Sequence, residues 1–352
     1  MDEADTQKKI CLASDNCSPA HPLVIQAIVD ANEGFAASYG PDRWTEKAID
    51  LIRTSMGAPC RVFMVPTGTG GNVLGLLLAC HRYESVVCTD IAHIHYQESG
   101  SAEAIVGCKL LTVPHEMGKI RPDHVIQKLR SERAFGKHST SPRVLAITQP
   151  TEIGTVYTLS ELKSLGKLCH DENLLLHMDG SRLYNAAVAL KAELHDIVLA
   201  ARIDTLALGG TKNGLVGAEA LVVFNDTLIL GSEHLHKQTL QLLSKMRYLS
   251  AQYIPFLTKK LWSTLAQAAN LRAQEIASVI SKIPEVSLSY PVETNQVFFT
   301  VPFEWILPIQ EKISCMLWDG AINQLRFVAS WNTSAEDVKG VEAIFAVLAK
   351  NL

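Results

Sequence analysis

Between residues 61 and 224, short apolar runs alternate with longer amphipathic segments, and this alternation restricts the fold more than any other feature of the chain. Each run has the length and the β-branched content of a buried strand, and each longer segment has helical spacing. Such an alternation favours an α/β fold with a mostly parallel central sheet. The strand candidates are RVFMV, VVCT, KLLTV, VLAIT, LLLHM, TLAL and ALVVF.

The segments on either side predict the domain organisation. Helical spacing is found over 22–32 and 44–56, and again in a long stretch over 255–283. Three further strand candidates, VSLSY, QVFFT and LRFVAS, then precede a closing helix over 335–352, a pattern typical of a small α+β domain. We therefore expect an N-terminal segment at 1–30, a large domain at 31–255 and a small C-terminal domain at 256–352.

Charge and hydropathy argue against two classes of partner. The formal net charge is -4, and no cluster of Lys and Arg is evident that could neutralise nucleic-acid phosphates. No apolar run approaches the roughly 20 residues of a membrane-spanning helix, and the first ten residues lack the basic and apolar regions of a secretory signal. We therefore expect a cytoplasmic protein that binds neither nucleic acid nor membrane. The eight cysteines are scattered without the spacing of a metal finger.

Polar residues follow four of the strand candidates. VVCT is followed by Asp90 and His93, VLAIT by Gln149, LLLHM by Asp179, and TLAL shortly by Lys212. In open α/β sheets ligands bind beyond the carboxyl ends of the strands, where residues distant in sequence converge. The sequence therefore predicts one site built from these residues.

Lys212 stands in GGTKNGLVG, between two apolar runs. A salt-bridged structural lysine is the usual interpretation of such a residue, but the glycines around it leave space beside its amine. Burying an ammonium group is costly and lowers its pKa. A desolvated lysine is a nucleophile that forms an imine with a carbonyl compound.

The motif PTGTGGN joins the strand candidate RVFMV to a helical segment. At Gly68, Thr69 and Gly70 the free N–H groups of a helix start favour an anion such as phosphate. The alternative is a merely tight turn, because the motif is neither a Walker A sequence nor a complete dinucleotide fingerprint. A nicotinamide dehydrogenase is disfavoured for the same reason, and because no acidic partner for a ribose follows at the required distance.

Asp179, Arg182 and His93 each allow a structural and a functional interpretation. Asp179 is either a helix N-cap or the counter-ion of a protonated ring nitrogen. The planar fork of Arg182 suits a carboxylate, or a structural salt bridge. His93 is either structural or a group for ring stacking or proton transfer. With His95 it would face opposite ways in a strand and lacks a third ligand, so we expect no metal site.

Pyridoxal 5′-phosphate meets these demands together. Its phosphate would bind at the turn from Gly68 to Gly70, and its ring nitrogen would face Asp179. Its ring would lie against His93, and its aldehyde would form an imine with Lys212. An imine explains how this lysine can be buried.

In combination and order, the motifs resemble those of the L-threonine aldolase and aromatic amino-acid beta-eliminating lyase family, in particular its low-specificity bacterial branch. The resemblance implies a fold-type I pyridoxal-phosphate enzyme, with an aspartate aminotransferase-like large domain that binds the cofactor and a smaller C-terminal domain. The motifs that carry it are ASDNCSPAHP, AASYGPDRWT, VPTGTGGN, DIAHIHYQESG, TQPTEIGTVYTL, HMDGSRLYNA, GGTKNG, LLSKMRYLSAQ and LRFVASWNT.

The resemblance also implies a role for each site residue. The residues that it assigns to the cofactor are Gly68, Thr69, Gly70, His93, Gln149, Asp179, Arg182, Lys212 and Arg247. Those that it assigns to the substrate are Ser14, Tyr39, Arg182 and Arg326, of which Ser14 and the two arginines hold the carboxylate. Arg247 is expected to reach the phosphate of a neighbouring subunit and Tyr39 to lie near a shared active site, in a homotetramer built from two tight dimers.

One departure from the family bears on the chemistry. Many members carry a histidine near the substrate hydroxyl, where TQPTE has Glu152. The general base therefore stays open between His93, a bound water and Glu152. The implied reaction is retro-aldol cleavage of L-threonine, L-allo-threonine and related β-hydroxy-α-amino acids to glycine and an aldehyde. The alternatives are a β-eliminating lyase or an aminotransferase, which share Lys212 and Asp179, and an inactive protein of the same fold.

Overall fold

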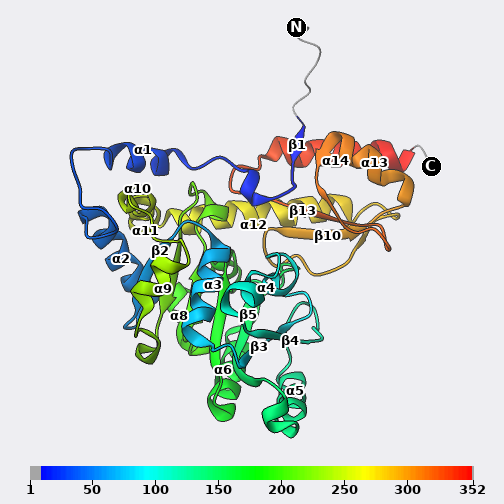
Figure 1. Cartoon of the computed structure of the whole chain (residues 1–352). Coiled ribbons are helices and arrows are strands. Elements are labelled where there is room, and N and C mark those ends of the chain that lie inside the picture. Colours follow the sequence, from blue (N-terminus) through cyan, green and yellow to red (C-terminus); the bar gives the residue numbers. More distant parts are fainter. Residues whose placement is uncertain (1–8, 351–352) are drawn as a thin grey trace.

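A computed structural model describes residues 9–350, and a seven-stranded sheet forms the centre of its larger part (Figure 1). The strands lie in the order β2 (Arg61–Val65), β8 (Glu219–Val223), β7 (Thr205–Leu208), β6 (Leu175–Gly180), β5 (Ser141–Thr148), β3 (Glu84–Thr89) and β4 (Lys109–Val113). The five strands from β7 to β4 are parallel, and β8 is antiparallel to both of its neighbours. Every predicted strand of this region is present, and the mostly parallel sheet is confirmed.

Helices pack on both faces of this sheet. Along β2, Val62 and Met64 join one hydrophobic core while Phe63 and Val65 join another, as the alternation of side chains in a strand requires. The first core contains α2 (Arg43–Met56), α5 (Pro122–Ala134), α6 (Leu159–Glu172) and α8 (Leu194–Ala201), whereas α3 (Gly68–Ala79) packs on the other face. Burial on both faces explains why the strands read as continuous apolar runs.

A four-stranded antiparallel sheet lies in the second part of the molecule (Figure 1). Its strands are β12 (Met316–Asp319), β13 (Gln324–Val328), β10 (Gln296–Thr300) and β9 (Ser287–Leu288), and its helices are α13 (Phe303–Lys312) and α14 (Ala335–Lys350). Phe299, Phe327 and Phe345 form its aromatic core together with Trp305. The start of the chain joins this part, because β1 (Ile10–Cys11) pairs with β11 (Ile313–Ser314) and Leu12 lies in the same core.

The predicted long helix over 255–283 is two helices, α11 (Tyr253–Thr258) and α12 (Leu261–Ile280). Lys260 separates them with a left-handed backbone, at a φ of 49°. Leu261 and Leu265 of α12 belong to the core of the large sheet, whereas Ile276 and Ile280 belong to that of the small sheet. The helix therefore bridges the two cores, and the domain limits given above remain a prediction.

Other differences from the expected elements are small. VSLSY forms only the two-residue β9, and neither β12 nor α13 was predicted. His93 and His95 lie in a helical turn after β3, α4 (His93–Tyr96), so the strand geometry considered for a metal pair does not apply to them. The remaining helices are α1 (Pro22–Asp30), α7 (Leu183–Leu190), α9 (Ser232–Gln238) and α10 (Met246–Ser250). No helix within residues 9–350 has the length and apolar character needed to cross a bilayer.

Candidate active site

A cavity lies at the carboxyl ends of β3, β5, β6 and β7, where the sequence predicts the site. The residues that line it are His93, Gln97, Thr148, Pro150, Thr151, Glu152, Asp179, Ser181, Arg182, Lys212, Gln296 and Arg326. The structure thus brings together the predicted catalytic residues and both predicted carboxylate-binding arginines. Gln149 is absent from this lining.

Asp179 lies near the end of β6 and is 3% exposed. Its Oδ1 accepts hydrogen bonds from the backbone and hydroxyl of Ser181 at 2.9 and 2.6 Å, and its Oδ2 accepts one from Asn72 Nδ2 at 3.0 Å. Burial opposes ionisation, but the charges of His93 and Lys212 and these hydrogen bonds hold the pKa of Asp179 below its usual value. Asp179 is no helix cap, because α7 begins two residues after Ser181. It is a buried carboxylate suited to a cationic partner.

Lys212 lies in a single helical turn after β7, and Glu219 of β8 fixes the backbone of this turn. The Glu219 carboxylate accepts hydrogen bonds from Gly210 N at 2.9 Å and from Thr211 N at 3.3 Å. Burial, followed by the charge of Arg182, lowers the pKa of Lys212. Within residues 9–350 the amine has no hydrogen bond or ion pair, so the salt-bridged alternative is not realised.

His93 is held at both its backbone and its ring. Its N–H donates to Glu152 Oε1 at 2.9 Å, and its ring Nδ1 lies 2.7 Å from Glu98 Oε1. Because a carboxylate can only accept, we assign the ring hydrogen to Nδ1, which leaves Nε2 as the nitrogen that can exchange a proton. The Glu98 side chain is 1% exposed, and the sequence did not identify it.

Asn72 links the carboxylates of Glu98 and Asp179. Its Nδ2 donates to both, at 2.8 and 3.0 Å, and its Oδ1 accepts from His177 Nε2 at 3.1 Å. Burial lowers the pKa of His177 to about 4, so its ring is neutral at physiological pH. Ligand-type atoms of His93, Glu98 and Asp179 lie within 4.8 Å of one another, and hydrogen bonds connect this cluster. The sequence did contain one signal for this cluster that was missed. Asn72 is a polar residue within the otherwise apolar helical segment GGNVLGLLLA, and it is buried in the structure.

Glu152 follows β5 and lies against His93. Its Oε1 accepts from Thr148 Oγ1 at 2.6 Å as well as from the backbone of His93. Burial raises the pKa of Glu152 above its usual value, so this carboxyl group takes up a proton more readily than an exposed glutamate does. It is therefore suited to general acid–base chemistry.

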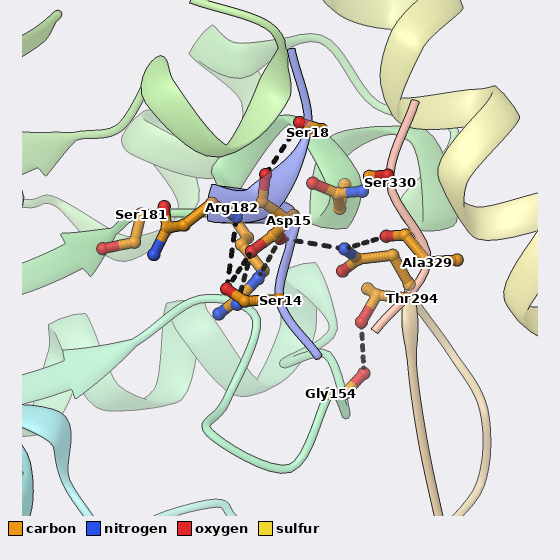
Figure 2. A network of polar contacts seen from close by, with 12 residues as sticks. Ser14, Asp15, Ser18, Gly154, Ser181, Arg182, Thr294, Ala329 and Ser330 are labelled. Carbon is orange, nitrogen blue, oxygen red and sulfur yellow. Dashed lines mark hydrogen bonds and ion pairs between the residues drawn. The ribbon is translucent and has the colours of Figure 1, made fainter. Parts of the chain in front are cut away.

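Arg182 forms a bidentate ion pair with Asp15, from the segment between β1 and α1 (Figure 2). Its Nε and Nη2 donate to the two carboxylate oxygens at 2.6 and 2.9 Å, and Asn295 Nδ2 donates to Oδ2 of Asp15 at 3.0 Å. The structural salt bridge is thus present, although Arg182 also lines the cavity. Ser14 lies beside this pair and accepts from Asn16 N at 3.1 Å.

Arg326 reaches the cavity from β13. Its Nη2 donates to Ala13 O at 3.3 Å, and its guanidinium group lies over the Trp318 ring, 4.9 Å from the centroid. Burial lowers the pKa of Arg326 to about 10, so the side chain stays cationic at neutral pH. Its Nε is buried without a hydrogen-bond partner in the described chain. These features suit the recognition of an anionic group.

The side chain of Gln149 lies against the backbone of Tyr157, and its assignment to the cofactor remains a prediction. Its side-chain amide is fully buried and forms two hydrogen bonds with the backbone of Tyr157, from Nε2 to the carbonyl at 2.9 Å and from the Tyr157 N–H to Oε1 at 3.0 Å. These bonds use one N–H of Nε2 and one lone pair of Oε1. Gln149 therefore holds the 150–157 loop.

The glycine turn begins α3 at Gly68. Thr67 caps the helix through a 3.0 Å hydrogen bond from Gly70 N to its hydroxyl, and Gly68 and Thr69 offer the N–H groups that a helix start leaves free. A Cβ atom on Gly70 would meet the side-chain amide of Gln241, which is the far end of a flexible side chain. An anion bound at Gly70 would displace the flexible end of Gln241.

Tyr39 and Arg247 do not line the cavity that contains Lys212 of the same chain. Tyr39 lines a separate cleft of about 400 Å³. Arg247 donates to Gly34 O at 2.9 Å, and its guanidinium group lies over the Tyr248 ring. Their predicted roles at the site of a neighbouring subunit remain predictions.

The residues in and beside the cavity have the chemistry that the predicted cofactor requires. Its requirements are a buried anion for the ring nitrogen, an amine of lowered pKa for the aldehyde and free N–H groups for the phosphate. Asp179, Lys212 and the start of α3 provide these three features.

Comparisons with known proteins agree with this geometry. Residues 12–303 match the sequence model of the beta-eliminating lyase family. The low specificity L-threonine aldolase of Pseudomonas aeruginosa is 36% identical over 93% of this chain and 94% of its own. The enzyme of the same name from a Pseudomonas species is 37% identical over 94% of this chain and 95% of its own. A solved structure of Leishmania major threonine aldolase superposes with a TM-score of 0.89 at 28% identity, covering 97% of this chain and 99% of that one. The chain therefore belongs to the beta-eliminating lyase family.

Proposed function

We propose that this protein is an L-threonine aldolase, which cleaves L-threonine, L-allo-threonine and related β-hydroxy-α-amino acids to glycine and an aldehyde. The observation that carries this proposal is the half-buried amine of Lys212, which has no ion pair within residues 9–350 and shares one cavity with the carboxylate of Asp179 and two arginines. The relatives named L-threonine aldolase, which match over most of the chain, support the choice of reaction.

Pyridoxal 5′-phosphate is the cofactor of this family. Lys212, Asp179 and His93 would hold its aldehyde, ring nitrogen and ring, and the helix start at Gly68, Thr69 and Gly70 would hold its phosphate. When bound, the cofactor accepts the electron pair that is released at the Cα of the substrate.

The protein's own residues bind the substrate and move protons. Arg326 and Arg182, with Ser14, bind the carboxylate, and Asp15 holds the Arg182 guanidinium in one orientation. Fixing the carboxylate selects which bond at Cα is broken. The carboxylate of Asp179 would hold a proton on the ring nitrogen of the bound cofactor. Because its pKa is lowered, the amine of Lys212 gives up a proton more readily than an exposed lysine does.

The proton of the β-hydroxyl group passes to His93, to Glu152 or to a water held between them. The Nε2 of His93 is free to exchange a proton when Nδ1 donates to Glu98. Glu152 has a raised pKa, as a residue that alternates between acid and base requires. We therefore propose these two side chains as the acid–base pair at the hydroxyl.

The assembly that we propose is a cytoplasmic homotetramer, a dimer of dimers with shared active sites. Tyr39 and Arg247 support sharing, because the family resemblance assigns them to an active site and each lies outside the Lys212 cavity of its own chain. All eight cysteines are free, which suits a reducing compartment.

A visible spectrum of the purified protein, before and after addition of an amino acid, tests the proposal. The holoenzyme should be coloured and should respond to L-threonine, L-allo-threonine and phenylserine. Borohydride should attach the cofactor to Lys212. Glycine and acetaldehyde from threonine would support aldol cleavage, whereas pyruvate or a 2-oxo acid from other amino acids would indicate the lyase or aminotransferase alternative. A colourless protein without an adduct at Lys212 would disprove the proposal.

A further inference from the structure

The side chain of Gln296 on β10 has unused hydrogen-bonding capacity. The residue is 2% exposed, and neither Nε2 nor Oε1 of its amide has a hydrogen-bond partner within residues 9–350. No other buried side chain of the described region lacks partners at both an amide nitrogen and an amide oxygen. A buried polar group without a partner is costly, so its retention indicates a partner that the fold itself does not supply.

The chain is held firmly at Gln296 and at the two residues before it. The backbone of Gln296 is in register with Val328 of β13. One residue earlier, Asn295 Nδ2 donates to Asp15 and to Ala329 O, and two residues earlier Thr294 Oγ1 donates to Gly154 O at 2.8 Å (Figure 2). The unpaired amide is therefore not the result of a loosely packed strand.

Gln296 and Arg326 face the same cavity. Across the two strands Phe298 lies opposite Arg326 and Gln296 lies opposite Val328, so Gln296 and Arg326 are diagonal neighbours on one face of the sheet. Trp318 contacts both Phe298 and the guanidinium group of Arg326. Arg326 Nε is buried and unpaired as well. Two adjacent strands thus present unused hydrogen-bonding groups to one small volume.

We propose that Gln296 is a substrate-binding residue, which donates from Nε2 to the α-carboxylate of the amino acid that Arg326 binds. This inference rests on the proposed function and adds a residue to its substrate site. A carboxylate offers about four acceptor positions. Arg182 already uses Nε and Nη2 on Asp15, and Arg326 uses Nη2 on Ala13. A neutral amide adds a hydrogen-bond donor for the carboxylate without adding another positive charge to those of Arg182, Arg326 and Lys212.

Two substitutions separate binding from a structural role. Gln296→Met removes both polar atoms at similar volume, and Gln296→Glu keeps the shape but places a negative charge beside the carboxylate. Gln324→Met is the matched control, because Gln324 is a buried glutamine of β13 that does not line the cavity. The measurements are the melting temperature of the holoenzyme, the affinity for glycine from the change in cofactor absorbance, and kcat and KM for L-threonine.

We expect Gln296→Met to keep or raise the melting temperature, because no hydrogen bond is lost. It should weaken glycine binding and raise KM by roughly tenfold, with kcat changed by less than about twofold. Gln296→Glu should weaken glycine binding further, and Gln324→Met should leave both constants unchanged. Glycine is the informative ligand, because it has the carboxylate but no substituent at Cβ.

Unchanged glycine affinity in Gln296→Met would overturn the inference. A higher KM for threonine together with unchanged glycine affinity would instead place the amide at the β-substituent, and a lower melting temperature with unchanged affinity would make Gln296 structural. Failure of the proposed function is a separate result. In that case the wild-type holoenzyme would neither respond to glycine nor release an aldehyde from threonine.

Discussion

The ring of His93 donates from Nδ1 to Glu98 across 2.7 Å, and the Glu98 carboxylate is itself buried and bonded to Asn72. The residue that would lie against the cofactor is thus oriented by a second residue, five positions later in the chain. The same hydrogen bond leaves Nε2 of His93 as the nitrogen that can exchange a proton.

Replacing Glu98 should impair turnover through His93. Glu98→Ala removes the acceptor, and we expect kcat to fall on the order of 100-fold while the cofactor is retained. Glu98→Gln should recover much of this loss, because its amide oxygen still accepts from Nδ1. In a double-mutant cycle, Glu98→Ala should add little to His93→Ala. Fully additive effects would mean that Glu98 acts independently of the histidine.

Asn72→Asp should destabilise the fold. It would place a third carboxylate between Glu98 and Asp179, both of which Asn72 contacts within 3.0 Å. An uncompensated buried charge costs about 3 to 5 kcal/mol. Urea unfolding of the protein measures this loss, and the exposed Asn16→Asp serves as the control, with an expected change within about 0.5 kcal/mol. Equal stability of the two variants would show that this cluster tolerates the added charge.

The ion pair between Asp15 and Arg182 should make stability depend on acid pH. Burial opposes ionisation of Asp15, but Arg182 holds its pKa below 3.8. A lowered pKa gives a contribution that is fully present above the ordinary value and is lost as pH falls through the lower, folded-state pKa. At pH 7 we expect Asp15→Asn to lower the free energy of unfolding by about 3 kcal/mol. The difference in this free energy between the variant and the wild type should become smaller below about pH 4. A gap that is independent of pH would argue against this pair.

Glu219 should make stability depend on pH in the opposite direction to Asp15. Burial raises its pKa from 4.5 to about 7, so its favourable contribution is full below pH 4.5 and is lost as pH rises through about 7. We expect Glu219→Gln to gain stability relative to the wild type between pH 5 and 8, by up to about 3 kcal/mol. Thermal unfolding across this range measures the difference. A constant difference would mean that Glu219 is ionised throughout.

Mixing two inactive variants tests whether active sites are shared. Lys212→Ala and Arg247→Ala should each be inactive or nearly so. If Arg247 serves the neighbouring subunit, random reassembly should restore about a quarter of the wild-type activity, because half of the dimers then hold one intact site. Mixing Lys212→Ala with Asp179→Ala is the control and should restore none. The absence of recovery with Arg247→Ala would assign this arginine to its own chain.

The strands of the large sheet were predictable from the sequence because burial on both faces leaves continuous apolar runs. The site was partly predictable for a related reason: His93, Asp179 and Lys212 follow strands whose carboxyl ends share one edge of the sheet. The break at Lys260 was not predictable, because a lysine carries no signal for a left-handed backbone. Propensity ranks it among the helix-forming residues.

The contacts of individual polar residues were not predictable from their positions in the sequence. Gln149 directly follows β5 and Asp179 lies near the end of β6, yet the Gln149 amide bonds to the backbone of Tyr157 and does not line the cavity. Asp15 forms its ion pair with Arg182, which lies 167 residues later in the sequence. In both cases the partner is set by the packing of loops, which local pattern does not encode.

Asp15 also meets Asn295 across 280 positions, and this contact has a consequence for synthesis on the ribosome. A nascent chain can complete the large sheet while Asn295, whose side chain bonds to Asp15 of the Asp15–Arg182 pair, has not yet been translated. The ability to bind an amino-acid substrate should therefore arise only when synthesis of the chain is nearly complete, well after the central strands have formed.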